Sequence, residues 1–261
     1  MDSGALLTPS DRARPAVRGL ELVVAGVGAL VTLVVSAMAF GTLTDAVREH
    51  DGVTRDDWSI LRFFTQHRSG SLDAAARIAS DVGAVPVLAL LALAAGAFLW
   101  WRRAPLGASV APVTALSLAG VAVVVIKGAL SRPRPPVSLH LVTETSASFP
   151  SGHATDSAAA LLAVALAFAV FLLRRPLLRW ITVAVGAVAT ACVGLSRLVL
   201  GVHWPTDVVA GWALGTCSAL AIILLASALA RPPLGTPTGE DGPTARAVHR
   251  VRVTMARRRT G

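Results

Sequence analysis

The sequence predicts an all-α integral membrane protein: a bundle of six transmembrane helices, with short amphipathic helices in the first extracytoplasmic loop. Only 15% of the 261 residues are charged and 54% are hydrophobic, whereas a soluble domain of this size carries about 25% charged residues. The mean hydropathy is +0.65. The apolar residues also gather in six runs, each close to the ~20 residues with which a helix crosses the hydrocarbon of a bilayer.

The six apolar runs occupy residues 20–43, 84–101, 107–128, 154–173, 180–199 and 208–229. Several of them are rich in alanine and glycine, which lets membrane helices pack closely. The first run contains Ala37-Met38-Ala39, which resembles a signal-peptidase site, so a cleaved signal segment is an alternative. Because this run is longer than the ~7–15 residues of a signal core, we interpret it as an uncleaved membrane helix.

The segment between the first two runs, residues 44–83, is too polar to span a membrane. Thr54-Arg-Asp-Asp57 matches a capping box and predicts the start of a short helix. A second short helix is expected from Leu72 to about Asp81. Both are interpreted as amphipathic helices that lie at the membrane surface.

The two ends of the chain are polar and rich in arginine. We expect residues 1–19 and 231–261 to be disordered, with residues 20–230 forming one membrane domain. With the N-terminus in the cytoplasm, fifteen of the 24 Lys+Arg residues fall on the cytoplasmic side. The positive-inside rule therefore places both termini in the cytoplasm of a multi-pass cell-membrane protein.

The formal net charge of +9 does not indicate a nucleic-acid partner. The arginines flank apolar runs and do not form one solvated stripe, which a nucleic acid would require. The expected partner is the bilayer itself. No feature of the sequence indicates an oligomeric state.

Three polar segments interrupt the apolar sequence, and each lies at the end of an expected helix on the extracytoplasmic side. They are Lys127 to Pro135, Pro150-Ser-Gly-His153, and Ser196 to Asp207. Together they supply three cations, two imidazoles, a hydroxyl and a carboxylate, an inventory that suits a phosphate group. The candidate site residues are Lys127, Arg134, Ser151, Gly152, His153, Arg197, His203 and Asp207.

The residue types favour phosphate chemistry, although each has an ordinary structural alternative. Ser151 and Gly152 precede an expected helix whose first N–H groups can bind an anion, or they form a plain loop-to-helix junction. Asp207, four residues after His203, can accept the Nδ1 proton and leave Nε2 free as a nucleophile or base. The alternative is a carboxylate that caps a helix beside a satisfied histidine.

The cations are similarly ambiguous when they are taken one at a time. Arg134 and Arg197 can each hold phosphate oxygens through two parallel hydrogen bonds. Lys127 is the only lysine of the chain and ends an apolar run, where a charge is costly and usually functional. A lysine that snorkels to the interface is the alternative.

The combination Lys-x6-Arg-Pro, Pro-Ser-Gly-His and Ser-Arg-x5-His-x3-Asp, within residues 127–207, resembles the three-part signature of the type 2 phosphatidic acid phosphatase superfamily. This superfamily includes vanadium haloperoxidases and bacterial acid phosphatases. The six-span layout resembles its membrane-bound lipid phosphatase branch over roughly residues 20–230.

The resemblance implies a role for each residue of the signature. His203 would attack phosphorus and form a phosphohistidine, Asp207 would orient His203, and His153 would donate a proton to the leaving oxygen. The phosphoryl oxygens would be held by Lys127, Arg134, Arg197, Ser151 and the backbone of Gly152.

We therefore expect a membrane phosphatase that hydrolyses a lipid phosphomonoester or diphosphate, such as polyprenyl diphosphate, phosphatidate or phosphatidylglycerol phosphate. No metal or cofactor is expected, because Asp156 and Asp207 are the only acids between residues 145 and 230. A vanadium-dependent haloperoxidase and a non-catalytic lipid carrier are the alternatives. The membrane spans argue against the first, and the presence of both histidines with Asp207 argues against the second. His140 and Glu144 are candidates to line the mouth of the site.

Overall fold

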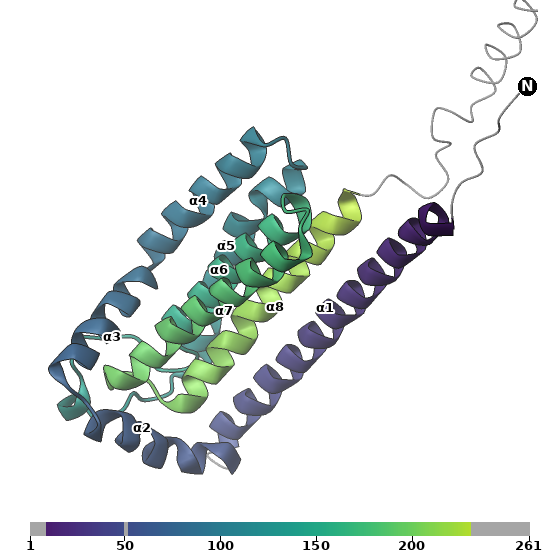
Figure 1. The fold of residues 1–261 in the computed structure, drawn as a ribbon. Helices are drawn as coiled ribbons and strands as arrows, with labels where there is room; N and C mark the ends of the chain where they lie inside the picture. Colours follow the sequence, from purple (N-terminus) through teal and green to yellow (C-terminus); the bar gives the residue numbers. More distant parts are fainter. Residues whose placement is uncertain (1–8, 50–51, 231–261) are drawn as a thin grey trace, which may run out of the picture. The chain divides into compact units, whose positions relative to one another are not determined.

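The computed structural model describes residues 9–49 and 52–230, and these residues form helices joined by loops without any strand (Figure 1). The chain divides into a unit of residues 1–227 and a unit of residues 228–261. The helices are α1 (Pro9–Glu49), η1 (Gly52–Asp56), α2 (Asp57–Gln66), α3 (Gly70–Val82), α4 (Val85–Trp101), α5 (Leu106–Leu130), η2 (Val137–Leu139), α6 (Gly152–Phe171), α7 (Pro176–Val199) and α8 (Pro205–Leu229).

Within the described residues, five helices are long and apolar enough to cross a membrane by length and composition: α5, α6, α7, α8 and the part of α1 from Val24 to Glu49. Helix α4 has 17 residues and follows α3 with a bend of 53°. If this bent pair is one span, the number of spans is six. The predicted all-α membrane bundle is thereby confirmed, with five or six candidate spans among the described residues.

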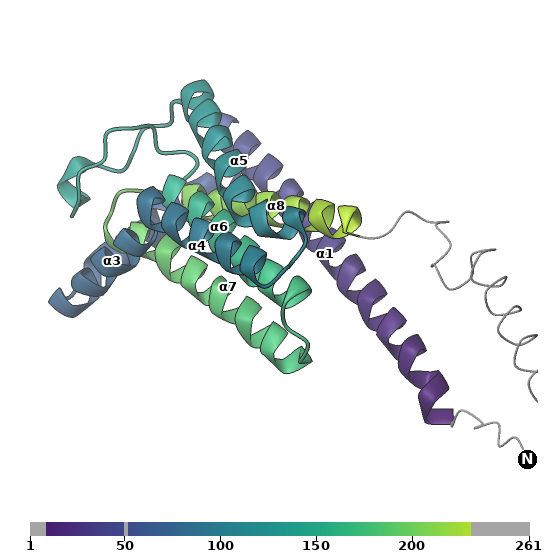
Figure 2. The ribbon, with the colours of Figure 1, turned by 90° about the horizontal axis from the view of Figure 1, so that it is seen from above.

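Helix α6 is the central helix of the bundle. Its alanines, among them Ala158, Ala159 and Ala163, are fully buried, because a methyl group fills little space and lets neighbouring backbones approach. Glycines of the neighbouring helices face it: a Cβ at Gly186 of α7 would lie 3.2 Å from the Leu161 carbonyl oxygen. Figure 2 shows α6 among α4, α5, α7 and α8. This close packing fixes where the N-terminus of α6 emerges.

Helix α1 packs against the bundle through its C-terminal half. Phe40, Leu43 and Val47 contact Phe149 and Ala210 in one apolar cluster. From Val24 onward, much of the remaining surface of α1 is apolar and exposed, as is expected of a helix that faces lipid.

Two expectations about helix starts are wrong. Residues 9–19, expected to be disordered, continue α1, which starts at Pro9 and not near Leu20. A helix nucleated by the apolar run propagates into preceding alanines and arginines of high helix propensity. The predicted disorder of residues 1–8 and 231–261 lies outside the described residues. The capping box also fails, because Asp56 is the N-cap of α2 and makes no side-chain cap hydrogen bond, while the Asp57 carboxylate binds elsewhere.

A tight turn after α7 leads into the third polar segment. Gly201 has a φ of +73°, a conformation that side chains other than glycine rarely adopt. A Cβ on Gly201 would collide with the Leu139 carbonyl oxygen and lie 2.6 Å from Nη2 of Arg68. Arg68 itself donates to the carbonyl oxygens of Val199, at 2.6 Å, and Leu139, at 2.8 Å. The turn and the loop after α5 are therefore held together two residues before His203.

Replacement of Gly201 by alanine should destabilise this turn by about 1–3 kcal/mol, the usual cost of a strained backbone conformation. The measurement is the thermal unfolding temperature of the purified protein in detergent. Gly128→Ala is the control, since Gly128 is an exposed helical glycine with no heavy atom within 4 Å of an added Cβ. Equal unfolding temperatures for Gly201→Ala and the wild type would show that the turn tolerates a side chain.

Candidate active site

The eight candidate residues gather at one end of the bundle, where α5 and α7 end and α6 and α8 begin. Lys127 lies in the last turn of α5, and Arg197 in the last turn of α7. Ser151 is the N-cap of α6, and Asp207 lies in the first turn of α8, which Pro205 opens as expected. Antiparallel neighbours place these four helix ends together, and the loops 131–151 and 200–204 complete the site (Figure 1).

His203 is almost fully buried, and both of its ring nitrogens have partners. Nη1 of Arg134 lies 3.0 Å from Nε2, and Oδ2 of Asp207 lies 3.3 Å from Nδ1. Because a guanidinium only donates, Nε2 must accept, so this hydrogen-bond network assigns the proton to Nδ1. Burial lowers the pKa of His203 to about 4, against the opposing effect of Asp207. The imidazole is therefore neutral at pH 7, with the lone pair on Nε2.

Asp207 is a fully buried carboxylate with a complete set of donors. Oδ2 accepts hydrogen bonds from the Ser148 hydroxyl and from the backbone N–H of Trp204, the latter at 2.9 Å, besides the bond to His203. Oδ1 accepts from the guanidinium of Arg132. A buried charge is tolerated only when it is paired and hydrogen-bonded in this way.

Arg132 extends this network to α2. Its Nη2 donates to Oδ2 of Asp57 at 2.7 Å, and its Nη1 donates to the Thr206 hydroxyl at 2.8 Å. Asp57 also accepts from the backbone N–H of Thr206 at 2.9 Å and from its hydroxyl at 2.6 Å. The start of α8 is thus tied to α2 and to the loop after α5.

The sequence prediction did not include Arg132, Ser148 or Asp57 among the site residues. Arg132 lies two residues before Arg134 in an Arg-Pro-Arg-Pro sequence, and Ser148 lies three residues before Ser151. Asp57 is separated from Asp207 by most of the chain, and its sequence context predicted only a helix start. A sequence pattern holds no signal for such a long-range pairing.

Glu144 occupies the space between two of the candidate phosphate ligands. Its Oε2 lies 3.3 Å from Nη2 of Arg134, and its Oε1 forms an ion pair with Nη2 of Arg197. Burial by itself raises the pKa of Glu144, but the two guanidinium groups outweigh burial and bring it below its ordinary value. The carboxylate is therefore ionised at neutral pH and partly exposed. Glu144 was expected to line the mouth of the site, and in the structure it lies closer, in contact with Arg134 and Arg197.

Arg197 has a guanidinium whose donors are not all used. The side chain is 1% exposed, and Nη1 donates to the Ser80 hydroxyl while Nη2 pairs with Glu144. Nε is buried and has no partner among the described residues 9–49 and 52–230. An unused buried N–H is costly, and an anion oxygen is a natural acceptor for it.

The other candidates surround the same space. Nζ of Lys127 donates to the Ser146 hydroxyl at 3.0 Å and to the Ala147 carbonyl oxygen at 2.6 Å. Arg134 also donates to Ser146, through Nε to its carbonyl oxygen at 2.7 Å. Burial lowers the pKa of Arg134, but a guanidinium keeps its proton throughout the physiological range.

The N-terminus of α6 brings the second polar segment to the cations. The Ser151 hydroxyl accepts from the backbone N–H of Ala154 at 3.5 Å, and Ser151 N–H donates to the Asp207 carbonyl oxygen at 3.0 Å. The helix begins at Gly152, two residues earlier than expected, so His153 belongs to its first turn and Pro150 precedes the cap. His153 interacts electrostatically with Arg197, Glu144 and Lys127. The arrangement is a cationic cradle at a helix N-terminus, next to a neutral buried histidine.

The family model of the PAP2 superfamily matches residues 108–231. This segment contains the whole candidate site apart from Asp57 and Ser80, and the match confirms the resemblance found in the sequence. Over this segment the chain is therefore similar to the PAP2 superfamily.

Three curated relatives each match a part of the chain. The chain is 42% identical over 72 residues to an undecaprenyl-diphosphatase of Sulfolobus acidocaldarius. It is 42% identical over 97 residues to a decaprenylphosphoryl-5-phosphoribose phosphatase of Mycolicibacterium smegmatis, and 40% identical over 106 residues to phosphatidylglycerophosphatase B of Escherichia coli. The matched segments cover 28%, 36% and 39% of this chain, and 30%, 47% and 37% of the respective relatives.

Solved structures show the same fold over a larger part of the chain. A transmembrane PAP2-type phosphatidylglycerolphosphate phosphatase from Bacillus subtilis superposes with a TM-score of 0.66 at 26% identity, covering 76% of this chain and 95% of the other. Aquifex aeolicus LpxE has a TM-score of 0.51 at 21% identity, with 64% and 94% covered, a likeness of fold alone. This chain is a multi-pass membrane protein of that fold.

Glu144→Gln should strengthen the binding of inorganic phosphate to the site, because it removes a competing negative charge from the two arginines. A hydrogen bond to a charged group contributes about 1.5–3 kcal/mol, so we expect a decrease in Kd of roughly tenfold or more. Isothermal titration of the purified protein with phosphate measures the change. Asp81→Asn removes the same charge from an exposed position and is the control. Weaker phosphate binding in Glu144→Gln would mean that Glu144 supports the cradle and does not compete with the anion.

Proposed function

We propose that the protein is a lipid phosphate phosphatase that hydrolyses a phosphomonoester or diphosphate of a membrane lipid through a phosphohistidine intermediate. The observation that carries the proposal is the pair formed by His203 and Arg134. The lone pair of Nε2 faces a guanidinium that also holds a carboxylate, Glu144, together with Arg197. A phosphoryl group that displaces Glu144 would meet the same donors beside the nucleophile.

In the first step, His203 Nε2 forms a bond to phosphorus while the bond from phosphorus to the lipid oxygen breaks. The leaving oxygen takes a proton from His153. The positive charge that develops on the imidazole is stabilised by Asp207, which already holds Nδ1. Arg134, Arg197 and Lys127, with Ser151 and the backbone N–H of Gly152, hold the equatorial oxygens, where charge spreads in the transition state.

In the second step, a water molecule attacks phosphorus and the bond from nitrogen to phosphorus breaks. The electron pair returns to Nε2, and neutral His153 takes the proton of the attacking water. Inorganic phosphate then leaves, and Glu144 can return to the arginines. The three cations and the start of α6 carry the charge stabilisation, so the proposed reaction needs no metal ion.

The membrane setting favours a lipid as the substrate. The eight candidate residues all lie on membrane helices or on loops that join them, which suits a phosphate presented at the level of lipid headgroups. The names of the relatives point to isoprenoid phosphates and phosphatidylglycerol phosphate as substrates. We extend this substrate class, without a choice among its members, to the present chain.

We further propose that the site faces away from the cytoplasm and that both termini lie inside. The arginines between α4 and α5 and between α6 and α7 lie at the opposite end of the bundle from the site. The positive-inside rule assigns those loops to the cytoplasm.

The proposed activity predicts that the purified protein releases phosphate from lipid phosphates in detergent, with EDTA present. His203→Ala should abolish turnover of every substrate, because it removes the atom that bonds phosphorus. His153→Ala should lose about 10²–10⁴-fold more activity on a lipid phosphate than on p-nitrophenyl phosphate, since a lipid alkoxide needs a proton to leave and a nitrophenolate does not.

Three outcomes would contradict this assignment. Activity that disappears with EDTA and returns with magnesium would exclude the metal-free reaction. Equal losses on both substrates would restrict His153 to binding phosphate. Turnover of the aryl substrate by His203→Ala, but not by His153→Ala, would exchange the two roles.

The proposed orientation predicts which loops an impermeant thiol reagent reaches in intact cells. In a background with Cys192 and Cys217 replaced by alanine, a cysteine at exposed Ser138, in the loop after α5, should be labelled. A cysteine at exposed Arg174, between α6 and α7, should be labelled only after lysis. The reverse pattern would refute the orientation.

A further inference from the structure

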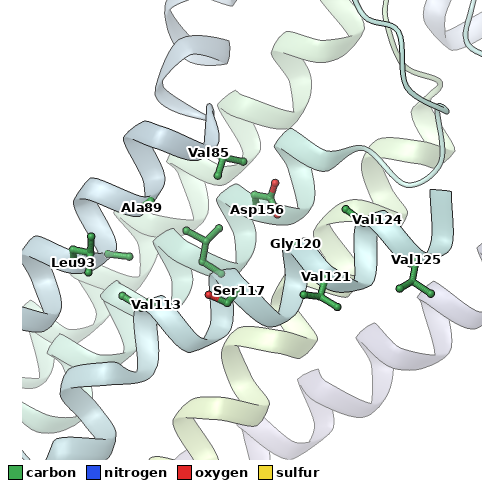
Figure 3. Close-up of a pocket in the computed structure, with 12 residues that line it drawn as sticks. Val85, Ala89, Leu93, Val113, Ser117, Gly120, Val121, Val124, Val125 and Asp156 are labelled. Atoms are coloured by element: carbon green, nitrogen blue, oxygen red, sulfur yellow. The ribbon is translucent and has the colours of Figure 1, made fainter. Parts of the chain in front are cut away.

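A groove of about 480 Å³ runs along the flank of the bundle between α4, α5 and α6 (Figure 3). Ten of its twelve lining residues are valine, leucine, alanine or glycine, and the other two are Ser117 and Asp156. Several of the lining valines, such as Val121, Val124 and Val125, are more than half exposed within a predicted span. An apolar chain is therefore the natural occupant of most of this groove.

Asp156 does not fit an apolar groove by itself. The residue is 6% exposed, and its Oδ1 is buried without a hydrogen-bond partner among the described residues 9–49 and 52–230. An intramembrane acid whose oxygen lacks a partner is costly and usually marks a functional site. Lys127 interacts electrostatically with Asp156, but its Nζ donates to Ser146 and Ala147.

Two glycines leave room beside the Asp156 carboxyl. A Cβ on Gly120 of α5 would lie 4.0 Å from Oδ1, and a Cβ on Gly152 would lie 3.9 Å from Oδ2. With no side chain at either position, the carboxyl borders the groove. Figure 3 shows Asp156 on α6 beside Gly120, among the apolar side chains of α4 and α5.

The position of Asp156 relates the groove to the phosphate site. It follows Gly152 by four residues, so at 1.5 Å per residue it lies about 6 Å further along the helix from the N-terminus. The proposed phosphoryl group binds at that N-terminus. The carboxyl is therefore level with the first few atoms of a lipid beyond its phosphate oxygen.

We propose that Asp156 and this groove form a substrate subsite for lipids that carry a hydrogen-bond donor, a hydroxyl or an amino group, within a few bonds of the phosphate. The apolar chain lies in the groove, and the donor pairs with Oδ1 of Asp156. This inference rests on the proposed phosphatase function. A lipid without the donor leaves the buried oxygen unpaired, and the protein should discriminate against it roughly tenfold or more.

The test compares two lipids that differ in one hydroxyl: 1-hexadecylglycerol 3-phosphate and 3-hexadecyloxypropyl phosphate. The full chain in detergent should show a kcat/KM at least about tenfold higher for the hydroxyl-bearing lipid. In Asp156→Ala the ratio should fall to about one, and in the isosteric Asp156→Asn, which keeps an acceptor oxygen, it should be intermediate. Ser117→Ala changes the only other polar side chain of the groove and should keep the wild-type ratio.

A second measurement does not depend on turnover. Non-hydrolysable phosphonate analogues of the two lipids should raise the unfolding temperature of the wild type unequally, and that of Asp156→Ala equally. If neither lipid releases phosphate, phosphatase activity on these two lipids is refuted, and the phosphonates still decide whether Asp156 recognises the donor.

Three results would overturn the subsite. They are an equal response of the wild type to both lipids, a wild-type preference that persists in Asp156→Ala, and a preference lost in Ser117→Ala instead. A parallel loss on both lipids in Asp156→Ala would assign Asp156 to the support of Lys127 or of the helix.

Discussion

The site depends on one buried charge, the carboxylate of Asp207. A fully desolvated carboxylate persists only if donors surround it, and here the donors come from three separate parts of the chain: Ser148, Trp204 with His203, and Arg132. Two of these hydrogen bonds also position other groups of the site. The bond to Nδ1 sets the tautomer of His203, and the bond to Arg132 draws in Asp57 and the start of α2. The geometry proposed for catalysis and the position of the loops at this end of the bundle thus both follow from the hydrogen bonds to the same buried charge.

The alanine-rich core of the bundle fixes the positions of the helix ends that carry the polar site residues. Small side chains on α6 and glycines on α7 and α8 let the backbones approach, so the ends of four helices are fixed by packing and not by the loops. Packing therefore holds the cations at these ends close together, although their mutual repulsion would otherwise separate them. Such preorganisation is what charge stabilisation in phosphoryl transfer requires.

Much of this arrangement was predictable from the sequence, and the exceptions have physical reasons. Apolar runs and arginines predict spans, and the spacing of Lys127, Arg134, His203 and Asp207 predicts the helix ends where they lie. Helix starts were less predictable, because α1 propagates into arginine-rich sequence and Asp57 leaves its expected capping role for Thr206 and Arg132. Asp57 meets the site only through tertiary structure, which no local pattern encodes. For Glu144 the sequence predicted a place at the mouth of the site, but not its pairing with Arg134 and Arg197.

Glu144 places an internal anion where an external one is proposed to bind. A group on the same chain is present at an effective concentration on the order of millimolar or above, whatever the composition of the medium. Free inorganic phosphate at lower concentration therefore competes poorly for the two arginines. A lipid phosphate is confined to the bilayer beside the site, and its apolar chain adds binding energy that the free ion lacks. In the proposed phosphatase, the arginine pair occupied by Glu144 would therefore favour anions delivered by the membrane over those delivered by the surrounding water.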